Sequence, residues 1–134
     1  MSSGGGPGRS GVTTVRAMLI TPDLDRLLAF YGRLLGAREV ERMPVEGRPF
    51  YVGLRLGDSD LGLVADGSAD LSAPQRILLS VEVPDVDGLL DDVAQLGGTV
   101  LSPPTDMPWG QRVVHLHDPD GNTVNLTQDI GSRA

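Results

Sequence analysis

The chain has 134 residues, 40% of them hydrophobic, which is enough for one domain or for two small halves that share a core. Its 18 acidic residues outnumber 11 basic ones for a formal net charge of −7, so no nucleic-acid partner is expected, and no apolar run is long enough to cross a membrane. Without cysteine the chain cannot form disulfides, thiolate nucleophiles or cysteine metal ligands, a composition that fits a cytoplasmic protein.

The N-terminal half predicts a strand, a helix and three further strands. Residues 1–12 are rich in glycine and serine, lack the apolar core of a signal peptide, and are predicted to be a flexible tail. A strand is expected over 15–21, and the Pro-Asp-Leu-Asp motif at 22–25 then indicates the start of a helix, because aspartate can cap the first turn. Apolar residues continue at helical spacing until Gly36, which can form the C-cap. Another strand and a hairpin over 50–64 complete this half.

The C-terminal half repeats this pattern. Pro84 starts the motif Pro-Asp-apolar-Asp-x-Leu-Leu that also starts at Pro22, an offset of 62 residues (84 − 22). A strand over 77–83 precedes it, Gly97 ends the second helix, and a hairpin over 112–127 closes the half. Each β-α-β-β-β half is too small to be stable alone, so the halves must pack on something. The expected organisation is an N-terminal tail at 1–12, a first module at 13–66, a linker at 67–76, a second module at 77–128 and a C-terminal tail at 129–134.

The turn of the second hairpin has a distinctive sequence. Asp-Pro-Asp-Gly-Asn at 118–122 combines a proline that presets one turn position, a glycine that accepts a positive φ, and side chains that hydrogen-bond their own backbone. This turn in DPDGNTVNL, the MPWGQR segment at 107–112 and the duplicated modules resemble the vicinal oxygen chelate superfamily over about residues 13–128. That superfamily contains glyoxalases, extradiol dioxygenases, thiol-transferring fosfomycin-resistance enzymes and bleomycin-type binding proteins. The resemblance implies the α+β glyoxalase/bleomycin-resistance fold, in which tandem βαβββ modules form a curved mixed sheet around a cleft, paired across a homodimer.

Alternation along the strands predicts which side chains line that cleft, because successive side chains point to opposite faces. The helix-facing set comprises Ala17, Leu19, Thr21, Phe50, Val52, Leu79, Val81 and Val83. The expected ligand-binding set comprises Arg16, Met18, Ile20, Tyr51, Leu78, Ser80, Trp109, His115, His117 and Asn125. Trp109 either closes the end of the sheet or stacks on a planar ligand. Arg16 either meets a ligand anion or pairs with Glu82 or another carboxylate, and the amide of Asn125 suits a hydrogen bond to a ligand carbonyl or hydroxyl.

In metal-dependent members of the superfamily, the ligands come from the first and last strands of each module. The resemblance places those four positions at Arg16, Gly62, Leu78 and Asn125. Arginine cannot deprotonate to bind a metal, leucine and glycine offer no donor, and an amide oxygen is a weak partner for a transition metal. We therefore expect neither a metal nor another cofactor. A rival metal site would use His115 and His117, two apart on one strand, with Asn125 or Glu82 as a third ligand.

No residue is assigned a catalytic role, because nothing in the spacing requires Glu82, His115 or His117 to act as a base. A cleft with apolar walls and a few polar groups is typical of a small-molecule site. The resemblance therefore favours a metal-independent protein that sequesters a bulky, largely aromatic natural product or antibiotic. The alternative is a glyoxalase- or dioxygenase-like enzyme, either metal-free or using a site at His115 and His117, that acts on a small-molecule metabolite.

Overall fold

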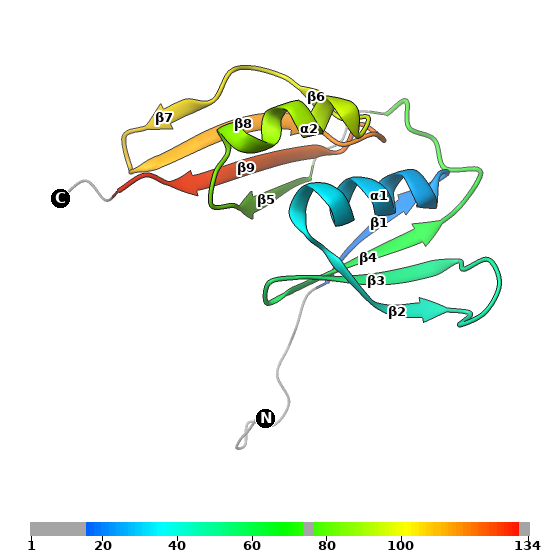
Figure 1. The fold of residues 1–134 in the computed structure, drawn as a ribbon. Helices are drawn as coiled ribbons and strands as arrows, with labels where there is room; N and C mark the ends of the chain where they lie inside the picture. The colour runs from blue at the N-terminus through cyan, green and yellow to red at the C-terminus, as the bar shows by residue number, and fades with distance from the viewer. Residues whose placement is uncertain (1–15, 74–76, 132–134) are drawn as a thin grey trace.

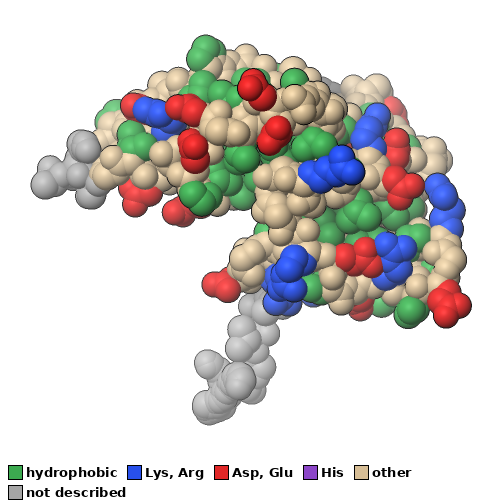
Figure 2. All heavy atoms as spheres, in the orientation of Figure 1, with side chains coloured by type: hydrophobic (Ala, Val, Ile, Leu, Met, Phe, Trp, Pro, Cys, Tyr) green, Lys and Arg blue, Asp and Glu red, His purple; other side chains and the backbone are tan. Residues whose placement is uncertain are grey.

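The computed structural model describes residues 16–73 and 77–131, which form two modules built on the same plan (Figure 1). The expected tail at 1–12, Val15 at the start of the first strand, part of the linker at 74–76 and the end of the C-terminal tail at 132–134 lie outside the described residues. Figure 2 shows that the second module projects beyond the first, so that the molecule is bent.

The first module is a four-stranded mixed sheet with one helix on it. Its elements are β1 (Ala17–Thr21), α1 (Leu24–Leu35), β2 (Arg38–Met43), β3 (Tyr51–Leu56) and β4 (Ser59–Ala65). The strand order is β1-β4-β3-β2, with β1 parallel to β4 and the other pairs antiparallel. Figure 1 shows α1 lying over one face of this sheet, which leaves the opposite face uncovered by its own helix.

The second module repeats this order, but its helix and its second strand are each divided into two short elements. Its elements are β5 (Leu78–Glu82), η1 (Asp87–Leu89), α2 (Leu90–Gln95), β6 (Thr99–Val100), β7 (Thr105–Met107), β8 (Gln111–His117) and β9 (Thr123–Asp129). The strand order is β5-β9-β8-β6, and β7 also pairs with β8. Two mixed sheets with few helices confirm the expected α+β class.

Helix α1 begins and ends as its sequence predicts. The side chain of Asp23 accepts a hydrogen bond from the backbone N–H of Arg26 at 3.1 Å, which satisfies one of the free donors of the first turn. Gly36 adopts a left-handed φ of 72° and its N–H caps the last turn. No helix in 16–73 or 77–131 is long and apolar enough to cross a membrane.

The second helix differs from the single helix expected after Pro84. The chain forms a 3-10 turn, η1, before the short helix α2. Gly88 stands in η1 where α1 has Arg26, and glycine is a weak helix former because it loses the most backbone freedom. The strand after this helix is also divided, since Pro103 and Pro104 separate β6 from β7 and proline cannot donate to a strand ladder.

Both modules contribute to one hydrophobic core. The helix-facing surface of each sheet packs against α1 and α2, and α1 touches α2. Fully buried members of this core include Leu27, Phe30, Val52, Leu63, Val93, Val114, Leu116 and Leu126. Because these residues come from both halves of the chain, neither sheet buries its apolar face alone, as the small size of each half requires.

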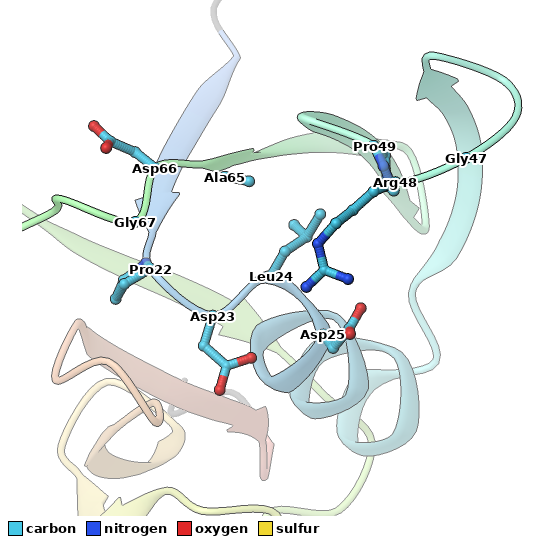
Figure 3. A pocket seen from close by; sticks show the side chains of 10 residues that line it. All are labelled: Pro22, Asp23, Leu24, Asp25, Gly47, Arg48, Pro49, Ala65, Asp66 and Gly67. Carbon is cyan, nitrogen blue, oxygen red and sulfur yellow. The ribbon is translucent and has the colours of Figure 1, made fainter.

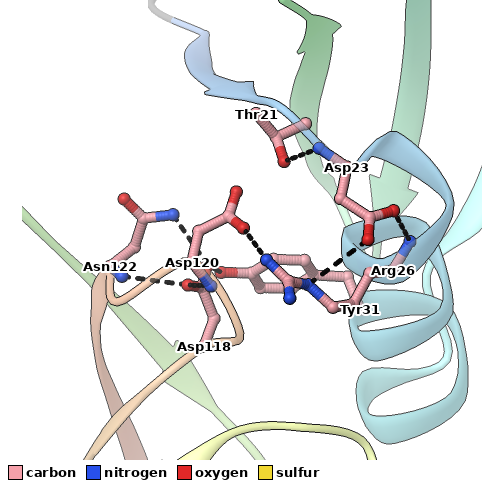
Figure 4. Close-up of polar contacts among 7 residues, drawn as sticks. All are labelled: Thr21, Asp23, Arg26, Tyr31, Asp118, Asp120 and Asn122. Carbon is pink, nitrogen blue, oxygen red and sulfur yellow. Dashed lines mark hydrogen bonds and ion pairs between the residues drawn. The ribbon is translucent and has the colours of Figure 1, made fainter. Parts of the chain in front are cut away.

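A buried polar cluster, which we call the inter-module clasp, joins α1 to the turn between β8 and β9 (Figure 4). The Tyr31 hydroxyl donates to Oδ2 of Asp118 at 2.7 Å, and Nη2 of Arg26 donates to Oδ1 of Asp120 at 2.8 Å. The other oxygen of Asp118 accepts the backbone N–H groups of Asp120 and Asn122. Burial, followed by the charge and hydrogen bond of Asp118, raises the pKa of Tyr31 far above its usual range, so the hydroxyl remains a donor.

One atom of the clasp is left without a partner. Both Asp118 and Asp120 are buried, and Oδ2 of Asp120 has no hydrogen-bond partner within the described part of the chain. A buried carboxylate oxygen without a donor is costly. The bond from Arg26 to the other oxygen of Asp120 offsets part of this cost, because hydrogen bonds between charged groups are the strong ones.

Candidate functional site

The cleft face of each sheet, meaning the face opposite the helices, carries the side chains that alternation assigns to it. On β1, Met18 and Ile20 are exposed, whereas Ala17 and Leu19 pack against the core. On β5, Leu78 is 49% exposed, Ser80 and Glu82 are also exposed, and Leu79 and Val81 pack against the core. The orientation predicted for both first strands is therefore the one observed.

Tyr51 lies across the cleft face of the first module. Gly53 and Gly62 are paired on β3 and β4, and neither has a side chain to stand above the sheet. A Cβ atom at Gly62 would be 3.0 Å from Cε1 of Tyr51 and 2.5 Å from the sulfur of Met18. A Cβ atom at Gly53 would be 3.2 Å from the Tyr51 hydroxyl. The two glycines therefore let the tyrosine ring and the methionine end cover the middle of this face.

Arg16 is held in place by two partners on this face. Its Nη1 donates to the Tyr51 hydroxyl at 3.1 Å, and its Nη2 lies 3.4 Å from Oδ2 of Asp60. Asp60 also accepts a short bond from Nε of Arg55 on the neighbouring strand. This bond to Arg55 and then the charge of Arg16 hold the pKa of Asp60 below its usual range. Of the alternatives expected for Arg16, the structure shows pairing with a carboxylate, which is Asp60 of its own module and not Glu82.

On the cleft face of the second module, an imidazole and an amide are joined. Nδ1 of His115 lies 2.6 Å from Oδ1 of Asn125 on the adjacent strand. An amide oxygen only accepts hydrogen bonds, so Nδ1 of His115 carries the proton, and in the neutral ring Nε2 is left with a free lone pair. His117 projects from the same face of β8 and lies opposite Thr123. No cluster of three or more His, Cys, Asp or Glu side chains in 16–73 or 77–131 is arranged to hold a metal.

Of two aromatic residues, Trp109 was left open between two roles by the sequence, and Phe50 was assigned wrongly to the helix-facing set. Trp109, in the turn before β8, is 65% exposed and its Nε1–H donates to Gln111 at 2.9 Å. Within one chain it therefore does not close the end of the sheet. Phe50, expected beside Val52 on the helix side, is 58% exposed, whereas Val52 is buried as expected. Phe50 belongs to the irregular segment before β3, where strand alternation does not apply.

The structure does not bring all ten expected ligand-binding residues together. On the first sheet Arg16 bonds to Tyr51, and the side chains of Tyr51 and Met18 both lie over Gly62. Ile20 follows Met18 on the same face of β1. Leu78, Ser80, His115, His117 and Asn125 share the cleft face of the second sheet, with Trp109 at its end. No hydrogen bond or ion pair among the described residues joins the first set to the second. A single chain therefore presents two separate cleft faces.

Two hollows on the surface differ in their relation to the expected site residues. A hollow of about 760 Å³ lies at the start of α1, beneath the loop that carries Arg48 (Figure 3). Two of its carboxylates already have partners, since Asp23 caps the helix and Asp66 accepts from Ser68, and it contains none of the expected site residues. A second hollow, of about 570 Å³, lies between the modules and has Ser80 at its edge.

A third hollow lies on the cleft face of the first module. We call it the charged hollow. It has a volume of about 300 Å³, and its lining includes Arg16, Glu41, Gly53, Arg55 and Asp60. Only Arg16 was expected at the site. Counting in steps of two from Tyr51 along β3 and from Gly62 along β4 would have placed Gly53, Arg55 and Asp60 on the same face.

The family model described as Glyoxalase/Bleomycin resistance protein/Dioxygenase superfamily matches residues 13–126. No curated protein sequence matches the chain. Among solved structures, a glyoxalase/bleomycin resistance protein/dioxygenase family enzyme from Burkholderia phytofirmans PsJN is similar with a TM-score of 0.72 and 23% identity, over 85% of this chain and 96% of that one.

Two other similar structures carry names of their own. TioX from Micromonospora sp. ML1 has a TM-score of 0.68 and 24% identity, over 88% of this chain and 99% of TioX. The fosfomycin resistance protein FosX from Mesorhizobium loti has a TM-score of 0.67 and 19% identity, over 89% of this chain and 92% of FosX. At these identities the likeness establishes the fold alone.

Proposed function

Because the chain belongs to the Glyoxalase/Bleomycin resistance protein/Dioxygenase superfamily, we propose that it is a metal-independent small-molecule binding protein. Its ligand would be a bulky, largely aromatic natural product or antibiotic, sequestered without chemical change in the cytoplasm. Structural similarity extends to a protein named for fosfomycin resistance and to TioX. The proposal depends on the side chains of this chain, because the same fold carries both enzymes and binding proteins.

One observation carries the proposal: the four positions at which the superfamily places metal ligands are used for other purposes here. At Gly62, the space for a ligand side chain is taken by the sulfur of Met18 and the ring of Tyr51. Arg16 is a cation bonded to a tyrosine and a carboxylate, and Leu78 has no donor atom. The remaining position, Asn125, already shares its oxygen with His115. These contacts support a cleft that binds a ligand directly.

The open surfaces supply the chemistry that such a ligand needs. Leu78 on β5 and the ring of Trp109, in the turn before β8, offer apolar contact at opposite ends of the second sheet, and Ser80 and Asn125 are paired on β5 and β9. Apolar walls with a few placed polar groups suit an aromatic compound, since the walls give affinity and the polar groups give orientation. The proposed ligand-binding set is Arg16, Met18, Ile20, Tyr51, Leu78, Ser80, Trp109, His115, His117 and Asn125.

We further propose that two chains pair to form two equivalent clefts. Exposed Met18, Ile20 and Leu78 lie on cleft faces that a single chain leaves open. A second copy related by two-fold symmetry would cover each face and bring the two halves of the binding set together. Sedimentation or light scattering measures this directly. A monomer at micromolar concentration that still binds ligand would contradict the pairing.

Binding without turnover is tested with a panel of aromatic natural products. A true ligand raises the melting temperature, because it binds only the folded state. Mass spectrometry after incubation should recover that compound unchanged, and any product would refute sequestration. Trp109→Ala should weaken binding by about 1–3 kcal/mol, the range for loss of aromatic stacking. Leu78→Glu should abolish binding, since it places a charge against an apolar ligand, and normal binding by this variant would put the cleft elsewhere.

Metal independence has its own test. Elemental analysis after mild purification should find less than stoichiometric zinc, iron or manganese. Asn125→Glu restores a carboxylate at one of the four positions, yet it should not create metal-dependent activity, because Arg16 and Leu78 still supply no ligand. About one metal per chain, lost on changing His115 or His117 to alanine, would overturn this proposal.

A second candidate function is supported by the geometry of His115. The hydrogen bond to Asn125 fixes the tautomer and leaves Nε2 of an exposed imidazole free, as a general base requires. A metal-free enzyme of this kind would convert the panel compound that it binds. His115→Gln should then abolish product formation while the rise in melting temperature remains, a separation that a pure binding protein would not show.

A further inference from the structure

The charged hollow on the first module contains an uneven set of charges. Two guanidinium groups, those of Arg16 and Arg55, share the single carboxylate of Asp60. Both arginine side chains are partly exposed, so their remaining N–H groups are accessible. A guanidinium has five N–H donors, and Arg16 uses only two of them, one for Tyr51 and one for Asp60. The arginine side of the hollow therefore has a net positive charge and N–H donors that are available to a ligand.

The hollow is also lined by a carboxylate, that of Glu41, which is not paired with an arginine. Glu41 projects from β2 beside Gly53, where its Oε1 would be 3.4 Å from a Cβ atom on that glycine. Within the described residues Glu41 has no hydrogen bond and no ion pair. The pKa of Arg16 is raised chiefly by Tyr51, then by the charge of Asp60, and least by the charge of Glu41. Glu39 on the same strand is different, because its carboxylate is bonded to Arg42 at 2.6 Å. Glu41 is therefore the carboxylate of β2 that is open to an external cation.

Gly53 lets the polar groups that line the hollow come close together over the sheet. Gly53 forms part of the hollow, and a Cβ atom there would come within 3.2–3.4 Å of the Tyr51 hydroxyl and of Glu41. The volume of about 300 Å³ is at the small end for a ligand pocket, so it suits one polar group of a molecule. The contents of the hollow are thus set by charge, with a carboxylate receptor on one side and an ammonium receptor on the other.

We propose that the charged hollow binds a zwitterionic group of the α-amino acid type. The carboxylate would accept from the free N–H groups of Arg16, and the ammonium would donate to Glu41. This inference deepens the proposed function, on which it rests, because Arg16 and Tyr51 lie on the same cleft face. It specifies that the ligand, or the part of it that reaches the first module, carries both an ammonium and a carboxylate.

Three matched probes separate the two charges. L-phenylalanine carries the ammonium and the carboxylate, phenylacetate carries only the carboxylate, and phenethylamine carries only the ammonium. Titration of the ¹⁵N-labelled full-length protein, followed by amide NMR shifts, detects weak binding and locates it. L-phenylalanine should bind about tenfold more tightly than either single-charge probe, since each of these lacks one charge-assisted contact. The largest shifts should occur on β1, β2 and β3 around Gly53.

Glu41→Gln tests the ammonium receptor, and Glu39→Gln is its matched control on the same strand. Both residues are exposed, so both variants should fold. Glu41→Gln should reduce L-phenylalanine affinity about tenfold, to that of phenylacetate, and Glu39→Gln should leave it unchanged. Equal binding of L-phenylalanine and phenylacetate by the native protein, or equal effects of the two variants, would overturn the inference.

The experiments can refute the zwitterion site and the proposed binding function separately. If a natural product raises the melting temperature but none of the three probes binds near Gly53, the zwitterion site is refuted and the binding function stands. If L-phenylalanine binds as described while no member of the natural-product panel binds, the charged hollow stands and sequestration of an aromatic compound fails.

Discussion

The two modules share a backbone plan and use it in opposite ways on their cleft faces. Each sheet places one residue from its first, last and middle strands side by side in a central row. In the first module this row is Met18, Gly62 and Gly53. In the second module it is Ser80, Asn125 and His115. The three equivalent positions are thus occupied by a methionine and two glycines in the first module, and by three polar residues in the second.

This difference shows that two modules with the same strand pairing can carry different chemical groups on their cleft faces. Hydrogen bonding between backbones fixes which residues are neighbours, and it does so equally in both sheets. The side chains then decide whether neighbours bind each other or remain available. In the first module, Tyr51 and Arg16 lie over the glycines and bind one another. In the second module, the imidazole of His115 is bonded on one side only.

The helices differ in the same way. Tyr31 of α1 corresponds to Val93 of α2, 62 residues later (93 − 31). The tyrosine hydroxyl reaches the turn of the opposite module and bonds Asp118, whereas the valine contributes only to the core. The connection between the modules is therefore one-sided, and substitutions at equivalent positions should have unequal effects.

The largest inequality is expected between Gly36, which ends α1, and Gly98, which lies 62 residues later (98 − 36) and directly after Gly97. At Gly98 a Cβ atom would lie 2.8 Å from the carbonyl oxygen of His117, 2.8 Å from the ring of Phe30 and 3.0 Å from Val93. Gly98→Ala should therefore lower the free energy of unfolding by about 3 kcal/mol, as overpacking of a rigid core does. Chemical denaturation of the purified variant measures this loss.

Gly36→Ala is the matched control, because nothing lies within 4 Å of its Cβ position. Its cost comes only from the left-handed φ of 72° and should be about 1 kcal/mol. Gly36→Asn should recover part of that loss, since asparagine tolerates this conformation. Equal losses for Gly98→Ala and Gly36→Ala would show that the crowding at the second module is relieved by small shifts.

A smaller effect is expected from the inter-module clasp. Tyr31→Phe removes the buried hydrogen bond to Asp118 and should lower the free energy of unfolding by about 2 kcal/mol, within the range for bonds to charged groups. Tyr51→Phe removes a bond to the partly exposed Arg16, and its loss should be smaller. Thermal and urea denaturation of both variants gives the comparison. A larger loss for Tyr51→Phe would mean that the cleft-face network, and not the clasp, supports the fold.

The smallest effect should be a pH dependence at the surface of each module. The pKa of Asp60 is lowered chiefly by Arg55, and the pKa of Asp106 by Arg112, from an ordinary value of 3.8. Because the pKa of each carboxyl group is lower in the folded protein than in the unfolded chain, each ionised carboxylate stabilises the fold at pH values above its unfolded-state pKa. This contribution is lost as the pH falls through the folded-state pKa. Both sites are solvent-screened, so the change should be slight.

Carboxyl ¹³C NMR titration should place both midpoints below 3.8. Asp60→Asn should make the free energy of unfolding depend less on pH in the acid range, because it removes one of the two lowered pKa values. Asp58 lies in the adjoining turn, so Asp58→Asn is a local control for the loss of one charge. If both variants change this dependence on pH equally, net charge and not the Arg55 pair accounts for it.

The sequence alone determined the parts of this protein that depend on neighbouring residues. The repeat of the Pro-Asp motif, the caps at Asp23 and Gly36, and the alternation along β1 and β5 all appear in the structure as predicted. These features follow from local sterics and from the period of each element, which short stretches of sequence specify. The prediction that Arg16, Gly62, Leu78 and Asn125 bind no metal also comes from the sequence, together with the family resemblance.

Only the tertiary structure decided which distant residues meet. It assigned Asp60 as the partner of Arg16, placed the Tyr31 hydroxyl on Asp118, and left Phe50 exposed at an irregular entry to its strand. It also put the two cleft faces on separate sheets. The partners in these two hydrogen bonds are 44 and 87 residues apart in the sequence. Whether they meet depends on how the helices and the two sheets pack around one core, and all the buried residues together determine that packing.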